Sequence, residues 1–308
     1  MRIGMIGLGV IAPFYAAALE QIEEAELVAV CDLDPLQIAP YRRPGLVEFT
    51  SYRLLLESSD VEAVLINTPN DQHFEIAGAA LAAGKHVCCE KPLTTTSLEA
   101  LALRDIAHQT GSTLFTAFHR RYNSNLRERL PQLLNHSNIA SVSAEYLERI
   151  QDHSGNDSWY LDPRRSGGGC IADNGPNVFD ALRSFLGPLM VVSADIVRRE
   201  SVDTLAAVKM LSHKKIRVDV LLDWDYDDGE KKQIAINLNS GQTILVDFLE
   251  GFPKFKESLW HEYVGVIEDF LDHIAKGQLD DGAGYEDVRL VESAYACEEI
   301  NEHGKATG

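Results

Sequence analysis

The residues with the clearest potential for chemistry end the run Lys85-His86-Val87-Cys88-Cys89-Glu90-Lys91-Pro92. Proline lacks the N–H of a strand ladder and disfavours helix for the residue before it, so we expect Lys91 to lie extended at the carboxyl end of a strand. In an open α/β sheet, that end is where ligands bind. A solvated lysine that merely closes a strand is the alternative.

A glycine turn near the N-terminus fits G-x-G-x-x-A between a predicted strand and a predicted helix. In this pattern Gly7 permits the tight turn, Gly9 lets the backbone approach a pyrophosphate, and Ala12 allows close packing of helix on strand. Amides at the start of the helix, here those of Val10 and Ile11, then bind the anion. A glycine turn in another kind of α/β protein is the alternative.

Asp32 stands at the end of the second predicted strand, 20 positions after Ala12. A carboxylate in this place accepts hydrogen bonds from the ribose hydroxyls of a dinucleotide and repels a 2′-phosphate. The residues that follow it, Leu33, Asp34 and Pro35, include no arginine. The sequence therefore predicts NAD rather than NADP.

The first third of the chain alternates short apolar runs with helical patterns, which is typical of βαβ units and a parallel sheet. We expect strands over residues 2–6, 26–31, 48–50, 63–67, 86–89 and 113–118. Helices are expected over residues 11–21, 52–57, 71–83 and 97–109.

The pattern changes after Phe118, so we place a domain boundary near Arg121. Strands are expected over residues 139–150, 190–198, 204–211, 216–224, 232–238 and 243–248, and helices over residues 125–134, 172–186, 259–275 and 285–301. The predicted fold is α/β. Residues 1–121 would form a Rossmann domain with a doubly wound parallel sheet, and residues 122–308 an α+β domain with an open, mostly antiparallel sheet.

Composition narrows the classes of function. The 47 acidic and 28 basic residues give a formal net charge of -19, which disfavours nucleic-acid and anionic-membrane partners. No apolar window has the length of a membrane span, and the N-terminus leaves no room for a secretory apolar segment. Five cysteines without C-x-x-C spacing predict a reducing cytoplasm. The ten histidines show no zinc spacing, so we predict no metal site.

Taken together, the motifs resemble the Gfo/Idh/MocA oxidoreductases over nearly the whole chain. The resemblance rests on the glycine turn, on Asn67-Thr68-Pro69-Asn70 with His73, on Gly84-Lys85-His86-Val87 before Glu90-Lys91-Pro92, and on Gly167-Gly168-Gly169 followed by Asp173, Gly175 and Asp180.

This resemblance implies that substrate binds between a Rossmann domain and an α/β domain whose open sheet serves oligomer contacts. It implies that Lys91 lies beside the nicotinamide and the substrate hydroxyl, as a proton relay or as a group that polarises the carbonyl. It also assigns Glu90 to the nicotinamide ribose and assigns to the cofactor loop Thr68, Pro69, Asn70 and His73.

The second catalytic segment departs from the family pattern D-x-G-x-H-x-x-D, in which aspartate and histidine share one helix face. Asp173 matches, but Asn177 stands at the histidine position. An amide binds a substrate oxygen but cannot exchange a proton near neutral pH. Either Lys91 carries the proton alone, another group substitutes, or the reaction differs from ordinary alcohol oxidation.

His119 is a candidate substitute, because it stands where the family often has asparagine. An exchange of roles between His119 and Asn177 is one hypothesis, and a hinge histidine satisfied by backbone is the alternative. Trp159 and Arg164 resemble the substrate-contacting loop, because an aromatic face near a guanidinium suits a sugar ring or a carboxylated polyol. A surface loop anchored by its tryptophan is the alternative there.

The sequence thus predicts an NAD-dependent dehydrogenase acting on the CH–OH group of a sugar, inositol or related polyol, assembled as a dimer or tetramer through its C-terminal sheet. Two alternatives stay open. One is a redox-neutral enzyme that holds NAD tightly for transient oxidation, as in glycoside cleavage or intramolecular oxidation-reduction. The other is a non-catalytic nucleotide-sensing regulator, against which the presence of Lys91 and Asp173 argues.

Overall fold

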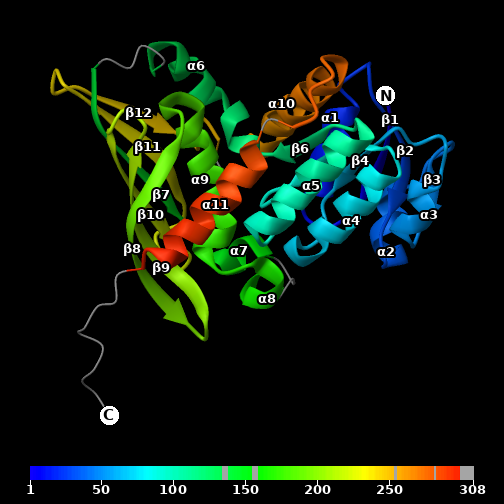
Figure 1. The fold of residues 1–308 in the computed structure, drawn as a ribbon, viewed down its shortest axis with the longest axis horizontal. Helices are drawn as coiled ribbons and strands as arrows, with labels where there is room; N and C mark the ends of the chain where they lie inside the picture. The colour runs from blue at the N-terminus through cyan, green and yellow to red at the C-terminus, as the bar shows by residue number, and fades with distance from the viewer. Residues whose placement is uncertain (134–137, 155–158, 253–254, 281, 299–308) are drawn as a thin grey trace.

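The computed structural model describes residues 1–133, 138–154, 159–252, 255–280 and 282–298 (Figure 1). Two six-stranded sheets stand side by side, with helices between and around them. Three predicted segments reach beyond the described residues. They are the last residue of the helix predicted over 125–134, the end of the helix predicted over 285–301, and the last residues of the second predicted domain, 299–308.

The first sheet is parallel throughout, in the order β3-β2-β1-β4-β5-β6. Its strands are β1 (Arg2–Ile6), β2 (Glu26–Cys31), β3 (Val47–Phe49), β4 (Ala63–Ile66), β5 (His86–Glu90) and β6 (Leu114–Ala117). The strand order reverses between β1 and β4, which directs a ligand crevice to the carboxyl ends of these strands. The predicted doubly wound Rossmann sheet is confirmed.

Short helices connect these strands, as the alternating pattern predicted. They are α1 (Ala12–Leu19), α2 (Pro35–Ile38), η1 (Ala39–Tyr41), α3 (Tyr52–Leu56), α4 (Asn70–Ala82) and α5 (Ser97–Thr110). The side chain of Thr96 caps α5 by accepting a hydrogen bond from the amide of Glu99, and Gly111 ends it with a φ of +71°.

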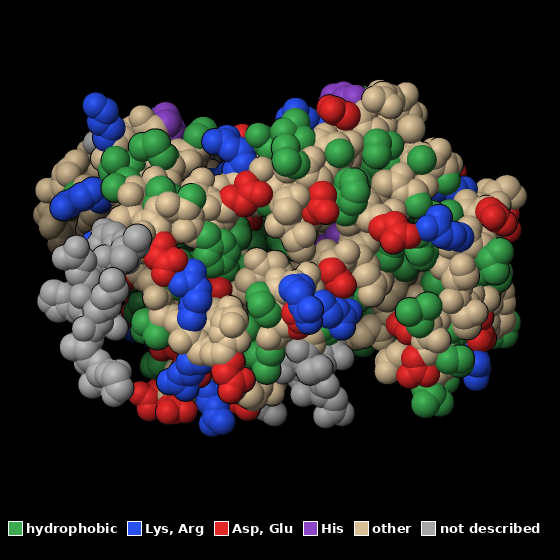
Figure 2. All heavy atoms as spheres, turned by 60° about the horizontal axis from the view of Figure 1, so that its bottom comes forward, with side chains coloured by type: hydrophobic (Ala, Val, Ile, Leu, Met, Phe, Trp, Pro, Cys, Tyr) green, Lys and Arg blue, Asp and Glu red, His purple; other side chains and the backbone are tan. Residues whose placement is uncertain are grey.

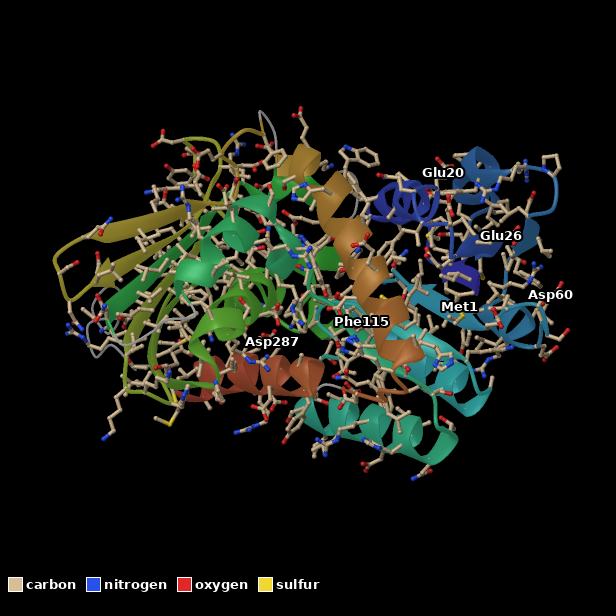
Figure 3. The ribbon with its side chains drawn as sticks, turned by 90° about the horizontal axis from the view of Figure 1, so that it is seen from above. Met1, Glu20, Glu26, Asp60, Phe115 and Asp287 are labelled. Carbon is tan, nitrogen blue, oxygen red and sulfur yellow. The ribbon has the colours of Figure 1, made fainter. Side chains whose placement is uncertain are left out.

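Helix α10 (Phe255–Ala275) comes late in the chain but packs on the first sheet. Five of its apolar side chains join the core around β1 and α1: Leu259, Tyr263, Val266, Ile267 and Phe270. Figure 3 shows α10 passing over Phe115, whose ring lies 5.8 Å from the ring of Phe270. Residues from the C-terminal half of the sequence therefore complete the core of the N-terminal sheet.

The second sheet has the order β12-β11-β7-β10-β9-β8, and only its β7–β10 pair is parallel among the described strands. Its strands are β7 (Ile139–Leu147), β8 (Leu189–Arg199), β9 (Val202–Ser212), β10 (Arg217–Asp223), β11 (Lys231–Leu238) and β12 (Thr243–Asp247). The predicted mostly antiparallel sheet is confirmed. The strand predicted to reach Ile150 ends at Leu147, because the chain turns there into the short helix α7 (Ile150–Ser154).

The remaining helices join and separate the two sheets. They are η2 (His119–Tyr122), α6 (Ser124–Leu133), η4 (Trp159–Leu161), α8 (Pro163–Ser166), α9 (Cys170–Leu186) and α11 (Ala283–Ala296). Helices α9 and α11 lie on the side of the second sheet that faces the first sheet (Figure 1). Asp287 of α11 is buried beside α9, 4.0 Å from Arg183 (Figure 3), and burial raises its pKa well above the usual value.

The outer side of the second sheet carries large apolar side chains in solvent. Met190 and Val192 of β8 are 61% and 51% exposed, and Leu245 of β12 is 49% exposed. On the face seen in Figure 2, basic and acidic side chains are interspersed. Among the described helices, none is both long and apolar enough to cross a membrane.

Candidate active site

A cavity of about 840 Å³ opens at the carboxyl ends of the first sheet and reaches the second sheet. This volume lies in the usual range for small-molecule and cofactor sites. Its lining includes the glycine turn, the ends of β2 and β5, the loop before α4, part of η2, and the first turns of α9. The sites predicted on separate motifs therefore meet in one cavity.

The glycine turn has the form that a pyrophosphate requires. Gly7 has a φ of +87°, and a Cβ there would lie 2.8 Å from the backbone of Asn67. Gly9 faces open space: a Cβ there would meet no atom within 4 Å, so an anion has room to approach its backbone. Val10 and Ile11 line the cavity. Ala12, the first residue of α1, is buried and does not line the cavity.

Asp32 lines the cavity next to this turn. Its two carboxylate oxygens accept hydrogen bonds from the amides of Leu8, at 2.8 Å, and Asp34, at 2.9 Å. The nearest arginines in the following sequence point elsewhere: Arg42 pairs with Glu48, and Arg43 donates to the carbonyl of Leu27.

The loop before α4 offers polar atoms that have no partner in the protein. Both side-chain polar atoms of Asn67 and the hydroxyl of Thr68 are buried without a hydrogen bond, and these residues line the cavity together with Pro69. Asn70 also lines it, and its amide donates to the carbonyl of Ser166, which ties the loop to the second half of the chain. Buried polar groups normally have partners, so these orphaned atoms fit a bound dinucleotide.

His73 supports this loop from below rather than lining the cavity. Its side chain is buried, and its two ring nitrogens lie 2.8 Å from the carbonyl oxygens of Thr68 and Pro92. Burial lowers its pKa. His73 thus links the loop before α4 to the segment that carries Lys91, which stands at a cis peptide bond with Pro92.

Glu90 is a buried carboxylate at the end of β5. Its Oε1 accepts hydrogen bonds from the hydroxyls of Tyr15, at 2.9 Å, and Tyr263, at 2.8 Å. Burial raises its pKa, while the Lys91 ammonium and the tyrosine donors oppose that rise. Two elements that lie far apart in sequence, α1 and α10, therefore hold this acid at the floor of the cavity.

Lys91 meets Asp173 across the two halves of the protein. Its Nζ donates to Asp173 Oδ1 at 2.7 Å and to the Asp173 carbonyl oxygen at 3.0 Å. Both side chains are largely shielded from solvent, with 13% and 11% exposed, yet both line the cavity. The functional interpretation of Lys91 is thus favoured over a solvated strand-end lysine.

Helix α9 is positioned by a carboxylate from the second sheet. Asp203 of β9 accepts hydrogen bonds from the amides of Gly169, at 2.7 Å, and Ile171, at 2.8 Å, and from the hydroxyl of Tyr295, at 2.8 Å. A Cβ on Gly169 would lie 2.0 Å from the carbonyl oxygen of Asp203, so only glycine permits this approach. The glycine triplet thereby sets where α9 begins, one turn before Asp173.

Asn177 projects into the cavity one turn after Asp173, and its Oδ1 is buried without a partner. Asn174 also lines the cavity and donates to Glu148 Oε1 at 2.9 Å. Glu148 in turn pairs with the buried Lys232 at 2.6 Å. On this side the cavity is thus lined by two side-chain amides of α9 and by a carboxylate whose charge is balanced by Lys232.

His119 lines the cavity from η2, and its partner is a side chain. Its Nδ1 lies 2.5 Å from Oε2 of the buried Glu262 on α10. Burial lowers the pKa of His119 to about 4, although the Glu262 carboxylate works in the opposite direction. A hinge histidine satisfied by backbone is therefore not what the fold contains.

The predicted substrate loop divides into a part inside the cavity and a part outside it. Trp159 and Tyr160 line the cavity, with their rings stacked at 3.8 Å between centroids. Arg164 does not line it: its side chain is 88% exposed and pairs with Asp162. The expectation that Arg164 contacts substrate is not supported by this arrangement, in which the guanidinium lies at the surface and bonds Asp162.

One group of possible metal ligands lies away from this cavity, among Asp269, Asp272 and His273 of α10. Asp269 accepts a hydrogen bond from the hydroxyl of Tyr122, and Asp272 pairs with Lys276. These carboxylates already have partners, so we assign no metal to them.

Sequence reasoning missed three buried charged groups, of which Glu148 lines the cavity and Glu262 and Lys232 lie behind its lining. Glu262 lies on the apolar stripe of α10, next to Tyr263 and one turn before Val266. Lys232 interrupts the buried side of β11, which is otherwise apolar, and Glu148 is a buried charge directly after the end of β7. A charge within a buried stripe was the available signal, because such a charge requires a partner.

The fold and the cavity together define an NAD-binding Rossmann oxidoreductase. Residues 1–118 match the family model described as "Oxidoreductase family, NAD-binding Rossmann fold", and residues 137–243 match the "GFO/IDH/MocA C-terminal domain". The chain therefore belongs to the Gfo/Idh/MocA oxidoreductase family, and the predicted family and fold class are confirmed.

Two relatives named as dehydrogenases show the range of similarity. The chain is 25% identical to a myo-inositol 2-dehydrogenase of Thermotoga maritima, over 99% of this chain and 98% of that protein. It is 34% identical to D-xylose 1-dehydrogenase (NADP(+)) 2 of Haloferax volcanii, over 56% of this chain and 50% of that protein.

Among solved structures, GenD2 from gentamicin A biosynthesis, in complex with NAD, has a TM-score of 0.85 at 19% identity, covering 96% of this chain and 93% of that one. The scyllo-inositol dehydrogenase of Lactobacillus casei, with NAD(H) and scyllo-inositol bound, has a TM-score of 0.81 at 19% identity, covering 97% and 96%. At these identities the likeness establishes the shared fold.

Replacing Asp203 by Asn tests the anchoring of α9. An amide offers one acceptor oxygen, whereas the carboxylate accepts from two backbone amides, the Tyr295 hydroxyl and the Cys170 thiol, so a buried donor loses its partner. We expect the free energy of unfolding to fall by about 1–3 kcal/mol, measured by equilibrium urea denaturation. Asp219→Asn, at an exposed position of β10, is the control. Equal unfolding midpoints for the two variants would contradict the anchoring role.

Proposed function

We propose that this protein is an NAD-dependent dehydrogenase that moves a hydride between nicotinamide and a secondary alcohol or ketone of a sugar, inositol or related polyol. The observation that carries the proposal is the pair of Lys91 and Asp173, which lies where the cavity at the glycine turn meets the polar wall of the second sheet. Bound NAD would be held by the glycine turn, Asp32 and the loop before α4, and would supply the hydride acceptor or donor.

Lys91 can act on a substrate oxygen because of how its donors are used. An ammonium has three N–H donors, and two of them go to the carboxylate and the carbonyl oxygen of Asp173. The third donor is left for the cavity. There it would stabilise negative charge that develops on the substrate oxygen, in a site largely shielded from water.

His119 is our candidate for the proton transfer. Its Nδ1 is engaged by Glu262, so Nε2 is the ring nitrogen available to the cavity. Asn177, whose Oδ1 is buried and unpartnered, would orient a substrate hydroxyl instead of exchanging a proton. These assignments support the exchange of roles between His119 and Asn177.

A polyhydroxylated ring suits the wall that faces Lys91. The amides of Asn174 and Asn177 offer hydrogen bonds to hydroxyl groups, and the stacked rings of Trp159 and Tyr160 offer a flat apolar face. The relatives named as inositol and xylose dehydrogenases favour the same class of substrate.

NAD is favoured over NADP by the charge around Asp32. Asp34 lies next to Asp32 in the cavity lining. Among the described residues, the lysines and arginines that line this cavity are Lys91 and Lys256. A 2′-phosphate next to these carboxylates would be repelled without a basic partner. One relative is named for NADP, so the coenzyme has to be tested on this chain.

We further propose a cytoplasmic homo-oligomer, dimer or tetramer, with residues 1–121 and 122–308 as its cofactor and substrate domains. The exposed apolar side chains on the outer side of the second sheet support self-association there. All five cysteines are free thiols, which agrees with a reducing compartment.

The function is tested by following NADH absorbance with NAD or NADP across a panel of inositols, aldoses and sugar derivatives. At least one substrate should give turnover that Lys91→Ala abolishes and that His119→Ala lowers about 10²- to 10⁴-fold, the usual worth of a general base. Lys209→Ala and His108→Ala change exposed residues of the same types and should match the wild type.

Other outcomes of this assay discriminate between the alternatives. Product formation without a net NADH signal would point to the redox-neutral enzyme. No Lys91-dependent turnover on any substrate would favour the regulator. Turnover and a pH profile that survive His119→Ala, while Lys91→Ala is inactive, would refute the exchange of roles.

Coenzyme choice is tested with Asp32→Asn, which removes the charge but keeps the shape. The ratio of kcat/KM with NAD to that with NADP should fall about tenfold or more, because a charge-assisted hydrogen bond is worth about 1.5–3 kcal/mol. Asp60→Asn, at an exposed site remote from the cavity, should leave the ratio unchanged. A wild type that prefers NADP would show that our interpretation of Asp32 is wrong.

Self-association is tested by sedimentation velocity. The wild type should sediment as a dimer or tetramer, and Val192→Lys should shift it towards the monomer by placing charge in an apolar contact. Leu98→Lys, at a position of α5 that is 79% exposed, is the matched control. A monomeric wild type would exclude the proposed assembly.

A further inference from the structure

Glu262 is a carboxylate on the buried face of α10, and no side-chain surface of it reaches solvent. The apolar residues around it, among them Leu259 and Val266, belong to the core of the first sheet. An isolated buried carboxylate would be strongly unfavourable, because it loses its hydration without gaining a partner. Glu262 therefore needs hydrogen-bond donors around it. The arrangement of these donors indicates what the carboxylate does in the site.

The two oxygens of this carboxylate serve different partners. Oε1 accepts from Arg120 Nη1 at 2.8 Å and from Asn123 Nδ2 at 2.6 Å. Oε2 accepts from His119 Nδ1 at 2.5 Å. Although burial raises it, the pKa of Glu262 is lowered to about 2 by Arg120 and by the hydrogen bonds of His119 and Asn123.

An ionised carboxylate accepts hydrogen bonds and donates none. The short contact between Nδ1 and Oε2 therefore requires the proton of a neutral His119 ring to sit on Nδ1. The lone pair is then on Nε2, which is the nitrogen left for the cavity. A carboxylate that bonds one ring nitrogen sets the tautomer in this way in many histidine sites.

A second contact from the same helix fixes the plane of the ring. The ring of Tyr263 stacks on that of His119, with centroids 5.5 Å apart and planes 17° apart. The hydroxyl of Tyr263 donates to Glu90 at the floor of the cavity. Adjacent residues of α10 thus hold the imidazole both by its edge and by its face.

We propose that Glu262 is a positioning residue that keeps His119 in the Nδ1–H tautomer and so presents Nε2 to the substrate as a proton acceptor. This inference rests on the proton-transfer role proposed for His119. In the oxidation direction the substrate O–H bond would break with its proton going to Nε2, and NAD, when bound, would be the acceptor of the hydride from the same carbon. The resulting imidazolium keeps its bond to Glu262, whose negative charge stabilises it.

Other charged groups near His119 would act against that imidazolium. Arg120 of η2 and Lys91 beyond β5 both disfavour the protonated ring, and burial does so more strongly. From α10, Glu262 is the group that favours it, and Tyr263 contributes a hydroxyl already bonded to Glu90. Loss of the Glu262 charge should therefore weaken His119 as a base as well as free its tautomer.

The test is Glu262→Gln in the full-length protein, with the His119 tautomer measured by long-range ¹H–¹⁵N NMR and assigned by comparison with His119→Ala. The wild type should show protonated Nδ1 and unprotonated Nε2. In Glu262→Gln the side-chain amide can donate to Nδ1, so the proton should shift to Nε2. With a substrate found by the assay panel, kcat should fall about 10²-fold or more while KM changes by less than about threefold.

Two further variants separate positioning from simple structural support. Ser258→Ala removes the 3.1 Å hydrogen bond to Arg120 and keeps the Glu262 carboxylate and the His119 ring, so tautomer and kcat should stay at wild-type values. If Glu262→Gln does not fold because Arg120 loses its counter-charge, Arg120→Gln with Glu262→Gln removes both charges of the buried pair and should show the same tautomer shift.

An unchanged tautomer and kcat in folded Glu262→Gln, or in the double variant, would overturn the inference even if His119→Ala is inactive. The proton-transfer role proposed for His119 fails in a different way: His119→Ala would then retain wild-type turnover, whereas the dehydrogenase function itself fails when no substrate gives Lys91-dependent turnover. In the first case the tautomer shift would remain a property of Glu262, but its catalytic role would be overturned.

Discussion

The contact between Lys91 and Asp173 is the interaction on which the site depends, because it is made by residues from the two halves of the chain. Lys91 follows β5 of the first sheet, and Asp173 lies in the first turn of α9 beside the second sheet. Two partly buried opposite charges lose hydration, and a contact of 2.7 Å with a second bond to the backbone carbonyl offsets that loss. Any shift between the sheets would weaken the contact between Lys91 and Asp173. Two further interactions fix the position of α9 relative to β5: Asp203 anchors the start of α9, and Asn70 bonds the segment just before it.

Helix α10 positions the groups on the first-sheet side of the cavity. It belongs to the late part of the sequence, yet its apolar face completes the core of the first sheet. From this fixed place Glu262 bonds His119, and Tyr263 bonds Glu90 and stacks on His119. Burying carboxylates this deeply is tolerable only when each lone pair meets a donor, and that requirement makes the groups around them rigid. Rigid groups are what a hydride and proton transfer needs, since rates fall steeply when reacting atoms are misplaced.

Asn177 stands where the family resemblance led us to expect a histidine, and its surroundings give the amide a physical meaning. An amide at this place can bind a substrate oxygen but cannot exchange a proton, whereas His119, which also lines the cavity, has a carboxylate partner. The wall is also nearly neutral in charge, since Lys232 balances Glu148. Arg164, which looked suited to an anionic substrate, is held at the surface by Asp162.

Local pattern was sufficient for the elements and for the cofactor half of the site. Strand and helix periodicity, the glycine turn and Asp32 lie within about thirty residues of one another, so their geometry follows from one βαβ unit. The proline after Lys91 and the order of the motifs also identified the family. The partners of these residues were decided by tertiary structure alone. Nothing local links His119 to Glu262 or Asp203 to Gly169, because such pairs form only when distant helices and strands are packed together and buried charges must find donors. The sequence by itself determined which groups could do chemistry, and the packing of α9 and α10 decided which of them face one another.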